Sequence, residues 1–419
     1  MGTVLEARGL VVRRGQHTVL RGADLSLDGG TCTLLLGENG TGKSTLIEAL
    51  LGLHPLEEGA VLAQSKVVRD AEGRRARRPH LPLGVLLQTD GSVRDQSVRH
   101  HLQVCASSAG VDVHDEALAE LAQRMDLRHR LDDRMLSLSE GQRRKVCVLG
   151  ALLPGLVHGR ESLLVLDEPM AALDERGRIA TVALVAEVMA RGATVLIGTH
   201  HPERFPLADQ TYVLNEGQLQ PIDHQLQPID QDGTAQNAEM TWPELTGNAT
   251  RPSPWGLGRR YAWSGGTPLS GAVLGVLMTL ALATLLFDAS SVTTLPPTVV
   301  LGLLLMPSFV AGSAGDAALL TLRRDRAFHR LYALGLRPRD PLTPLLLGAI
   351  SPLVMGLLLD VTVTMDVAGA GAVVALLLSQ CVAAADSLGL RLARPEALHL
   401  RLMMPLLVLP FGLLLDLLA

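Results

Sequence analysis

Apolar residues follow different patterns in the two halves of this 419-residue chain. In the first half they either alternate with polar residues or form short runs bounded by polar segments. Alternation indicates strands with one covered face, and a short apolar run indicates a strand covered on both faces. The predicted strands cover residues 4–12, 16–27, 32–36, 83–87, 163–166 and 194–197.

Helices are predicted between these strands. Residues 45–51 and 141–153 are expected to be helical, and the polar-rich segments 92–106 and 115–125 are expected to form a helical insertion. Strands that alternate with helices along a chain are typical of α/β domains. We therefore expect an α/β domain with a helical subdomain over residues 1–220.

The second half is far more apolar, and five of its segments approach the length of a transmembrane helix, which needs about 20 apolar residues. The segments cover 268–287, 295–320, 341–359, 367–385 and 402–418; the last is short and carries two prolines and an aspartate. The sequence predicts an all-α transmembrane domain of about five helices over residues 255–419. A polar linker over residues 221–254 is expected to join it to the first domain.

Arginine placement gives an independent reason for this division. The segments around 259–260, 323–339 and 391–401 are basic, whereas the loops at 288–294 and 360–366 contain neither lysine nor arginine. Cytoplasmic loops of membrane proteins carry an excess of lysine and arginine. The pattern places the first domain in the cytoplasm and the two loops without basic residues outside.

One loop in the first half has the phosphate-binding pattern G-x-x-x-x-G-K-[ST], between a predicted strand and a predicted helix. In such loops the backbone amides converge on phosphate oxygens, the lysine adds positive charge, and the serine hydroxyl is placed to hold Mg²⁺. The last threonine is expected to assist with the phosphate. The loop consists of Gly37, Glu38, Asn39, Gly40, Thr41, Gly42, Lys43, Ser44 and Thr45.

Two adjacent carboxylates, Asp167 and Glu168, end the predicted strand at 163–166. Successive strand residues point to opposite sides, so the two acids are expected to have different roles. We expect Asp167 to hold the Mg²⁺ shell and Glu168 to polarise an attacking water.

Four shorter features are weak signals when taken singly. Gln88 follows a strand and either reaches a metal or a water, or is an ordinary loop residue. Ser139 in the segment 138–142 is in a position to cap a helix. The exposed amides of this helix start either form an anion site or belong to an ordinary capped helix. A tight loop at 171–174 follows the acidic pair, and His200 follows the last predicted strand.

The order of these features resembles the ATP-binding cassette of ABC transporters, over roughly residues 3–220. In that family a phosphate loop, a Q-loop glutamine, a signature segment, an acidic strand, a D-loop and a switch histidine occur in this order. The counterparts here are 37–45, Gln88, 138–142, 163–167, 171–174 and His200. The resemblance implies a P-loop NTPase fold that uses ATP and Mg²⁺.

The same resemblance implies a site shared between two cassettes, so that a second copy or a related half-transporter is an expected partner. Glu168 would be the hydrolytic base, His200 would contact the terminal phosphate, and Gln88 would join them. Nucleotide contacts beyond the phosphate loop would come from Ser139, Gly141, Gln142 and Asp174. Mg²⁺ would be held by Ser44, Gln88 and Asp167.

Two positions depart from the family pattern. Glu140 stands in the signature where glycine is common, and Arg14 stands where an aromatic residue would stack on adenine. A guanidinium can also stack on a base, but adenine selectivity is then expected to be weak, and GTP stays an alternative substrate.

The basic segment 322–335 places Phe328, Leu331, Tyr332 and Leu334 among charged residues, which predicts a short amphipathic helix at the membrane face. It resembles the coupling segment of permeases of the ABC-2 export type. The alternative is a basic interfacial loop that only sets topology.

Composition excludes some other functions. The net charge of −5 gives no general case for nucleic acid binding, and four widely spaced cysteines suggest neither a zinc site nor disulfides. No signal peptide pattern is visible at the start. We expect an ATP-driven exporter in the cytoplasmic membrane, similar to the haem exporters of cytochrome c maturation, with export of drugs, polysaccharide or lipid as comparable alternatives. The alternative is a membrane-anchored mechanical ATPase that acts on an outside partner without moving cargo.

Overall fold

The computed structural model describes residues 2–73, 81–110, 113–206, 208–222, 253, 257, 261, 267–286, 295–313, 321–322, 325–334, 336 and 340–389. The chain forms two compact units. The first combines Met1–Pro252 with Asp325–Leu336, and the second combines Ser253–Arg324 with Arg337–Ala419.

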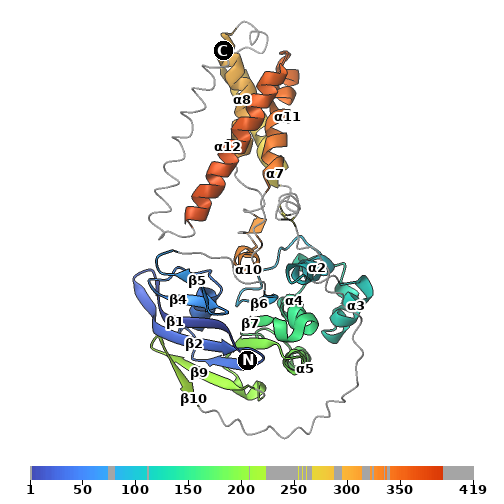
Figure 1. The fold of residues 1–419 in the computed structure, drawn as a ribbon. Coiled ribbons are helices and arrows are strands. Elements are labelled where there is room, and N and C mark those ends of the chain that lie inside the picture. Colours follow the sequence, from blue (N-terminus) through green and yellow to red (C-terminus); the bar gives the residue numbers. More distant parts are fainter. Residues whose placement is uncertain are drawn as a thin grey trace. The chain divides into compact units, whose positions relative to one another are not determined.

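A six-stranded sheet in the order β10-β9-β3-β8-β7-β6 forms the centre of the first unit (Figure 1). The five strands from β9 to β6 are parallel, and β10 is antiparallel to β9. Parallel strands end at one edge of a sheet, so the segments that follow β3, β6, β7 and β8 meet there. The strands are β3 (Cys32–Leu36), β6 (Leu83–Leu86), β7 (Leu163–Asp167), β8 (Thr194–Gly198), β9 (Gln210–Asn215) and β10 (Gln218–Ile222).

The predicted strands at 32–36, 83–87, 163–166 and 194–197 are confirmed by this sheet. Their apolar residues alternate between two cores, as expected for a sheet covered on both faces. In β7, for example, Leu164 and Leu166 face one core, and Leu163 and Val165 face the other.

A second, four-stranded antiparallel sheet has the order β2-β1-β4-β5. Its buried residues join one core of the six-stranded sheet together with those of the helix after the phosphate loop. The strands are β1 (Thr3–Arg14), β2 (His17–Asp28), β4 (Glu58–Ala63) and β5 (Lys66–Asp70).

Five helices belong to the N-terminal part of this unit: α1 (Lys43–Leu50), α2 (Val98–Ser108), α3 (Asp115–Arg124), α4 (Glu140–His158) and α5 (Glu175–Ala190). The helical insertion is confirmed, but α2 begins six residues later than the predicted start at 92. Ser97 caps it by accepting a hydrogen bond from the amide of His100 at 3.2 Å. Helix α5 has a very weak amphipathic pattern, and we did not predict it.

The predicted boundary between the first domain and the linker falls within a strand. Residues 218–222 form β10, which pairs with β9 at the edge of the sheet. Of these, only residues 221 and 222 belong to the predicted linker over 221–254. Residues 223–252, which make up most of the predicted linker, lie outside the described residues.

The regular structure described in the second unit is helical. Its helices α7 (Thr267–Leu286), α8 (Pro297–Ser313), α11 (Leu342–Leu359) and α12 (Met365–Gly389) coincide with four of the five predicted apolar segments. The fifth, at 402–418, lies outside the described residues. Within the described part of the chain, α11 is the one helix that is long and apolar enough to cross a membrane, and shorter apolar stretches lie in α7 (Val273–Leu285), α8 (Pro297–Gly312) and α12 (Met365–Cys381).

Small residues bring helices of the second unit close together. A methyl group placed on Gly348 of α11 would lie 2.5 Å from the backbone oxygen of Gly371 in α12. The buried hydroxyl of Ser308 in α8 donates to the carbonyl of Gly348 at 2.8 Å. Close packing at small residues, with hydroxyls bonded across helices, is typical of helices in membranes.

The short helix α10 (Phe328–Ala333) belongs to the first unit. Its Arg330 is only 3% exposed; it donates to the Sγ of Cys105 at 2.9 Å and to the Nε2 of His101. Burial and the charge of Arg330 hold the pKa of His101 well below its usual range, so the imidazole is a neutral acceptor. A short helix is present within the predicted segment 322–335, and its Arg330 is buried in the first unit.

Candidate functional site

The phosphate loop connects β3 to α1 at the carboxyl edge of the sheet. Gly42 has φ 111°, and a methyl group there would lie 2.8 Å from Val19 Cγ1, so the turn requires glycine. The Nζ of Lys43 donates to the carbonyl of Gly37 at 2.5 Å and to that of Glu38 at 3.0 Å. These bonds hold the ammonium group inside the loop, where a phosphate would meet it.

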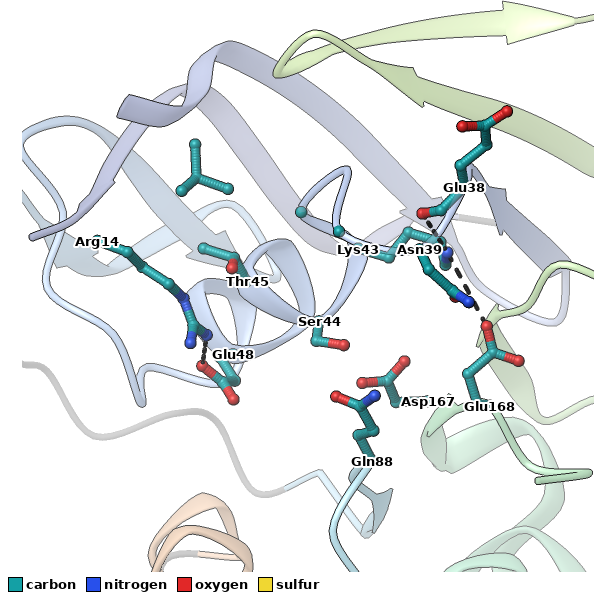
Figure 2. Close-up of a pocket in the computed structure, with 13 residues that line it drawn as sticks. Arg14, Glu38, Asn39, Lys43, Ser44, Thr45, Glu48, Gln88, Asp167 and Glu168 are labelled. Carbon is teal, nitrogen blue, oxygen red and sulfur yellow. Dashed lines mark hydrogen bonds and ion pairs between the residues drawn. The ribbon is translucent and has the colours of Figure 1, made fainter. Parts of the chain in front are cut away.

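A pocket of about 480 Å³ opens beside this loop (Figure 2). It brings together residues from the phosphate loop, β1, β2, α1, the segment after β6 and the end of β7. The lining residues are Arg14, Val19, Glu38, Asn39, Gly40, Gly42, Lys43, Ser44, Thr45, Glu48, Gln88, Asp167 and Glu168. The sequence-predicted loop, Gln88 and both acids are therefore part of one cavity.

The two acids differ in environment, as strand alternation predicted. Asp167 is only 1% exposed, and its Oδ1 has no hydrogen-bond partner among the described residues. Burial raises the pKa of Asp167, and the hydroxyl of Ser44 beside it acts in the opposite direction. Glu168 follows with φ 48°, a left-handed conformation that turns its side chain away from that of Asp167.

Ser44, Gln88 and Asp167 fit a magnesium site. All three line the pocket, and they offer a hydroxyl, an amide oxygen and a carboxylate, the hard oxygen ligands that Mg²⁺ prefers. The buried, unpaired Oδ1 of Asp167 is an acceptor that such a cation would satisfy. When bound, Mg²⁺ would neutralise phosphate charge at this place.

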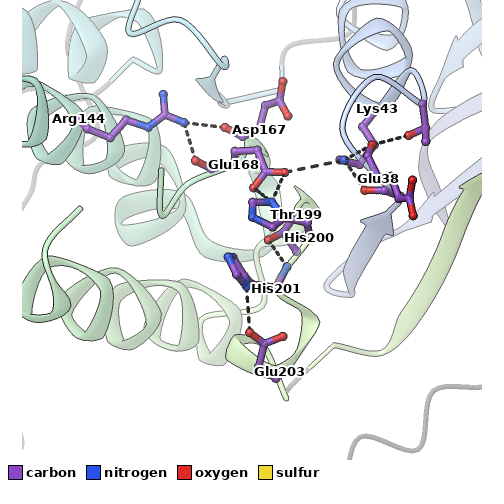
Figure 3. A network of polar contacts seen from close by, with 11 residues as sticks. Glu38, Lys43, Arg144, Asp167, Glu168, Thr199, His200, His201 and Glu203 are labelled. Carbon is purple, nitrogen blue, oxygen red and sulfur yellow. Dashed lines mark hydrogen bonds and ion pairs between the residues drawn. The ribbon is translucent and has the colours of Figure 1, made fainter. Parts of the chain in front are cut away.

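Glu168 is the centre of a polar network (Figure 3). The Nδ1 of His200 lies 2.9 Å from one carboxylate oxygen of Glu168 and 3.0 Å from the other, and the Nζ of Lys43 lies 3.9 Å away. The neighbouring His201 contacts Glu203 instead, at 3.1 Å. His200 is thus the histidine that the structure joins to the predicted base.

Arg144 is a positioning residue that we did not predict. Its guanidinium, 2% exposed, donates to the carbonyls of Asp167 and Glu168, both at 2.7 Å, and to the carbonyl of Leu87, also at 2.7 Å. One side chain from α4 therefore fixes the ends of β6 and β7. Its signal in the sequence was only an arginine soon after the signature segment.

The signature segment and the D-loop lie outside the pocket lining. Ser139 caps α4, and it exchanges two hydrogen bonds with Gln142, at 3.0 and 3.2 Å, which confirms the predicted cap. A methyl group on Gly141 would lie 2.8 Å from the carbonyl oxygen of Ala172. Asp174 caps α5 and pairs with Lys145 at 2.9 Å. The structure does not bring these residues to the phosphate loop of the same chain.

Comparison with known proteins agrees with these features. The family model described as "ABC transporter" matches residues 20–171. A zinc import ATP-binding protein, ZnuC, of Alkalilimnicola ehrlichii is 35% identical over 52% of this chain and 76% of its own length. The chain belongs to the ABC transporter family. It is an ATP-hydrolysing protein and provides the ATP-binding component of a transporter.

Two further comparisons cover the same part of this ABC protein. A cytochrome c biogenesis ATP-binding export protein, CcmA 2, of Cupriavidus metallidurans is 33% identical over 48% of this chain and 91% of the relative. A solved ATP-binding subunit of an ABC transporter matches with 25% identity and a TM-score of 0.44, over 52% of this chain and 90% of that one. One relative is named as an importer and the other as an exporter, so the cassette alone does not indicate direction.

The buried charge of Asp167 leads to a stability prediction. Its pKa is raised in the folded state, so ionisation of Asp167 destabilises the folded protein relative to the unfolded protein. The stabilising effect of the bound proton is complete below the ordinary pKa of 3.8. It is lost as the pH rises through the raised pKa of the folded state. At pH 7.5, without nucleotide or metal, Asp167→Asn should raise the unfolding temperature of the first unit by about 1–3 °C.

The same Asp167→Asn protein should show no stabilisation by Mg²⁺ with ATP. Differential scanning calorimetry of both proteins at pH 7.5, with and without Mg²⁺ and ATP, provides the measurement. A lower unfolding temperature for the ligand-free variant would show that Asp167 contributes favourably to the fold at this pH.

Proposed function

We propose that this chain is an ATP-driven exporter half-transporter, with its ABC cassette and a membrane domain on one polypeptide, and that it works as a dimer. It would lie in the cytoplasmic membrane with the cassette on the cytoplasmic side. ATP binding would close two cassettes, their movement would change the membrane helices, and hydrolysis would reset the cycle.

The observation that carries this proposal is the position of Asp325–Leu336 in the chain and in the fold. These residues follow α8 and precede α11, yet they belong to the first unit. Asp325 accepts a hydrogen bond from the amide of Arg94 at 2.8 Å, and Arg330 is buried against His101 and Cys105. A movement of α2 would therefore pull on apolar helices through the covalent chain.

The distribution of side chains in the second unit supports a lipid environment. Small residues occupy contacts between helices, whereas large apolar side chains are exposed. Leu346, Ile350 and Leu357 of α11 are 54%, 50% and 84% exposed, and Leu377 of α12 is 60% exposed. Lipid would cover an apolar surface of this kind, which water solvates at a cost of about 25 cal/mol per Å².

The residues outside the pocket lining support the dimer. Ser139, Gly141, Gln142 and Asp174 are not placed to contact a nucleotide bound by Lys43 of the same chain. In a dimer of facing cassettes they would contact the nucleotide of the other copy, as the family resemblance implies. Glu168 would then polarise the attacking water, and His200 would hold it in place.

We take haem as the first cargo to test, because the chain is similar to the haem exporters of cytochrome c maturation in its modest cassette and short ABC-2-like permease. Export follows from the resemblance of residues 322–335 to the coupling segment of that permease type. Residues 323, 324 and 335 of this segment lie outside the described part of the chain.

Two measurements test the proposed function in sequence. After expression, the chain should stay in the membrane pellet through an alkaline carbonate wash; recovery in the supernatant would exclude a membrane-spanning protein. Inside-out proteoliposomes containing the chain should then accumulate haem with ATP at least about fivefold faster than with a nonhydrolysable ATP analogue. Equal rates with both nucleotides would exclude haem export by this chain.

A further inference from the structure

The guanidinium of Arg330 lies in a closely fitted, buried place within the first unit. It donates to the Nε2 of His101 and, at 2.9 Å, to the Sγ of Cys105. Two glycines leave room for it: a methyl group on Gly91 would lie 3.0 Å from its Cβ, and one on Gly150 would lie 3.1 Å from its Nη2. Helix α10 is therefore held to α2 through one positive group that must find acceptors.

The hydrogen bonds of His101 determine which ring nitrogen carries the proton. A guanidinium has donors only, so the Nε2 of His101 accepts from Arg330, and the proton of the neutral ring is on Nδ1. The Nδ1 lies 2.6 Å from the amide of Gln96, whose Oε1 has no other hydrogen-bond partner among the described residues. Turned by 180°, this amide fits the same space and its Oε1 accepts the Nδ1–H. The three side chains then have one consistent set of bonds, in which His101 is neutral.

A second proton on His101 is incompatible with this arrangement. The imidazolium ring has two donors and no acceptor, so its Nε2–H would face an N–H of Arg330. Two positive charges would also share one buried place, which is costly. We propose that the contact between His101 and Arg330 is pH-sensitive: it holds the segment 325–336 on α2 while the ring is neutral and releases the segment when the ring is protonated.

The surroundings offer little to offset a second positive charge. The titratable and charged groups around this contact come from α10, α2, α4 and the segment after β6; they are Arg330, His100, Cys105, Cys147, Asp90 and Arg144. Burial raises the pKa of both thiols, that of Cys147 to about 12, so they stay uncharged near neutral pH. The carboxylate of Asp90 already lies 3.6 Å from Arg144.

The direction of the pH effect follows from the surroundings of His101. Burial, the charge of Arg330 and His100 hold the pKa of His101 well below its ordinary value of 6.5 in the docked state. Docking is therefore stabilised fully above pH 6.5, and this stabilisation is lost as the pH falls below it, by up to about tenfold in the docking equilibrium per pH unit. Separation of the apolar helices from the ATP cycle on acidification is a consequence that rests on the function proposed above.

Hydrogen–deuterium exchange of residues 325–336 in the full-length protein in detergent tests the proposal at pH 7.5 and pH 5.5. Each rate is divided by that of His101→Gln at the same pH, so that the intrinsic pH dependence of exchange cancels. Glutamine keeps an acceptor for Arg330 but cannot be protonated. From pH 7.5 to pH 5.5 the ratio should rise about tenfold. Asp325, which accepts from the amide of Arg94 at 2.8 Å, is retained in every variant.

The matched control is His100→Gln, the neighbouring histidine on α2, whose exchange should show the same rise of about tenfold. A rise of less than about twofold in the unmodified protein would overturn the proposal. Loss of the rise in His100→Gln would place the proton on His100 and overturn it as well. If His101→Gln failed to fold, exchange of residues 32–36 in the unmodified protein would serve as the reference instead.

The consequence for the apolar helices has a separate readout. In the Glu168→Gln background, the change that ATP causes in the exchange of residues 341–389 should fall to less than about a third at pH 5.5, and His101→Gln should restore it. If residues 325–336 were released at pH 5.5 while the response of 341–389 persisted, the pH-sensitive contact would stand. The coupling in the function proposed above would then fail.

Discussion

Glu168→Gln should reduce steady-state ATP hydrolysis by at least about 100-fold, while ATP binding changes by less than about threefold. The amide keeps the shape of the side chain but cannot accept the proton of the attacking water. Lys43, Ser44, Gln88 and Asp167, which we propose to hold the phosphates and Mg²⁺, are unchanged. Phosphate release measures turnover, and rapid filtration with labelled ATP measures binding and should show slow release of trapped ATP.

A matched control for this variant is Glu203→Gln. Glu203 is an exposed carboxylate that contacts His201, next to His200, and it does not line the pocket. It should keep turnover within about twofold of the unmodified protein. Glu168 would lose its role as base if Glu168→Gln retained more than about a tenth of the normal rate.

Arg330→Ala should disconnect the apolar helices from the nucleotide cycle. Loss of this guanidinium removes its bonds to His101 and Cys105 and leaves a gap beside Gly91 and Gly150, whose lack of side chains makes room for it. Removal of a buried, bonded charged group of this kind costs about 3 kcal/mol. We expect the segment 325–336 to lose most of the contacts that attach it to α2.

Hydrogen–deuterium exchange measures this loss without knowledge of the cargo. In the Glu168→Gln background, ATP should change exchange both in the phosphate loop and in residues 341–389. With Arg330→Ala added, the change at the phosphate loop should persist, and the change at 341–389 should fall to less than about a third. Arg326→Ala, on the same segment but exposed, is the matched control and should keep both responses. Equal responses in the Arg330→Ala and Arg326→Ala proteins would show that the segment does not transmit nucleotide state.

Much of the site could be predicted because its polar residues come directly after predicted strands. The apolar runs before Gly37, Gln88, Asp167 and His200 are strong signals, and parallel pairing brings their carboxyl ends to one edge. Strand alternation also predicted that the two adjacent acids have different surroundings, and Asp167 is indeed more buried than Glu168, while their roles stay a prediction. These inferences need only local patterns and the geometry of a sheet.

The features that escaped prediction depend on contacts distant in sequence. Arg143 and Arg144 are adjacent and chemically identical, yet only the second reaches the backbone of β6 and β7. Arg330 looks like a surface charge until α2 is placed beside it. Glu48 falls in an ordinary helix, and its partner Arg14 at the end of β1 lies 34 positions earlier. The pattern of apolar and polar residues within a single segment does not show which distant residues will contact each other.

The discontinuity of the first unit affects how the protein is made. Residues up to Ile222 leave the ribosome first and can build both sheets, but Asp325–Leu336 emerges only after α7 and α8 have been synthesised. Until then, the place beside His101 and Cys105 lacks the side chain that fills it in the finished protein. Completion of the ATPase unit therefore waits for the first pair of apolar helices, which delays full assembly of the enzyme until part of its second unit exists.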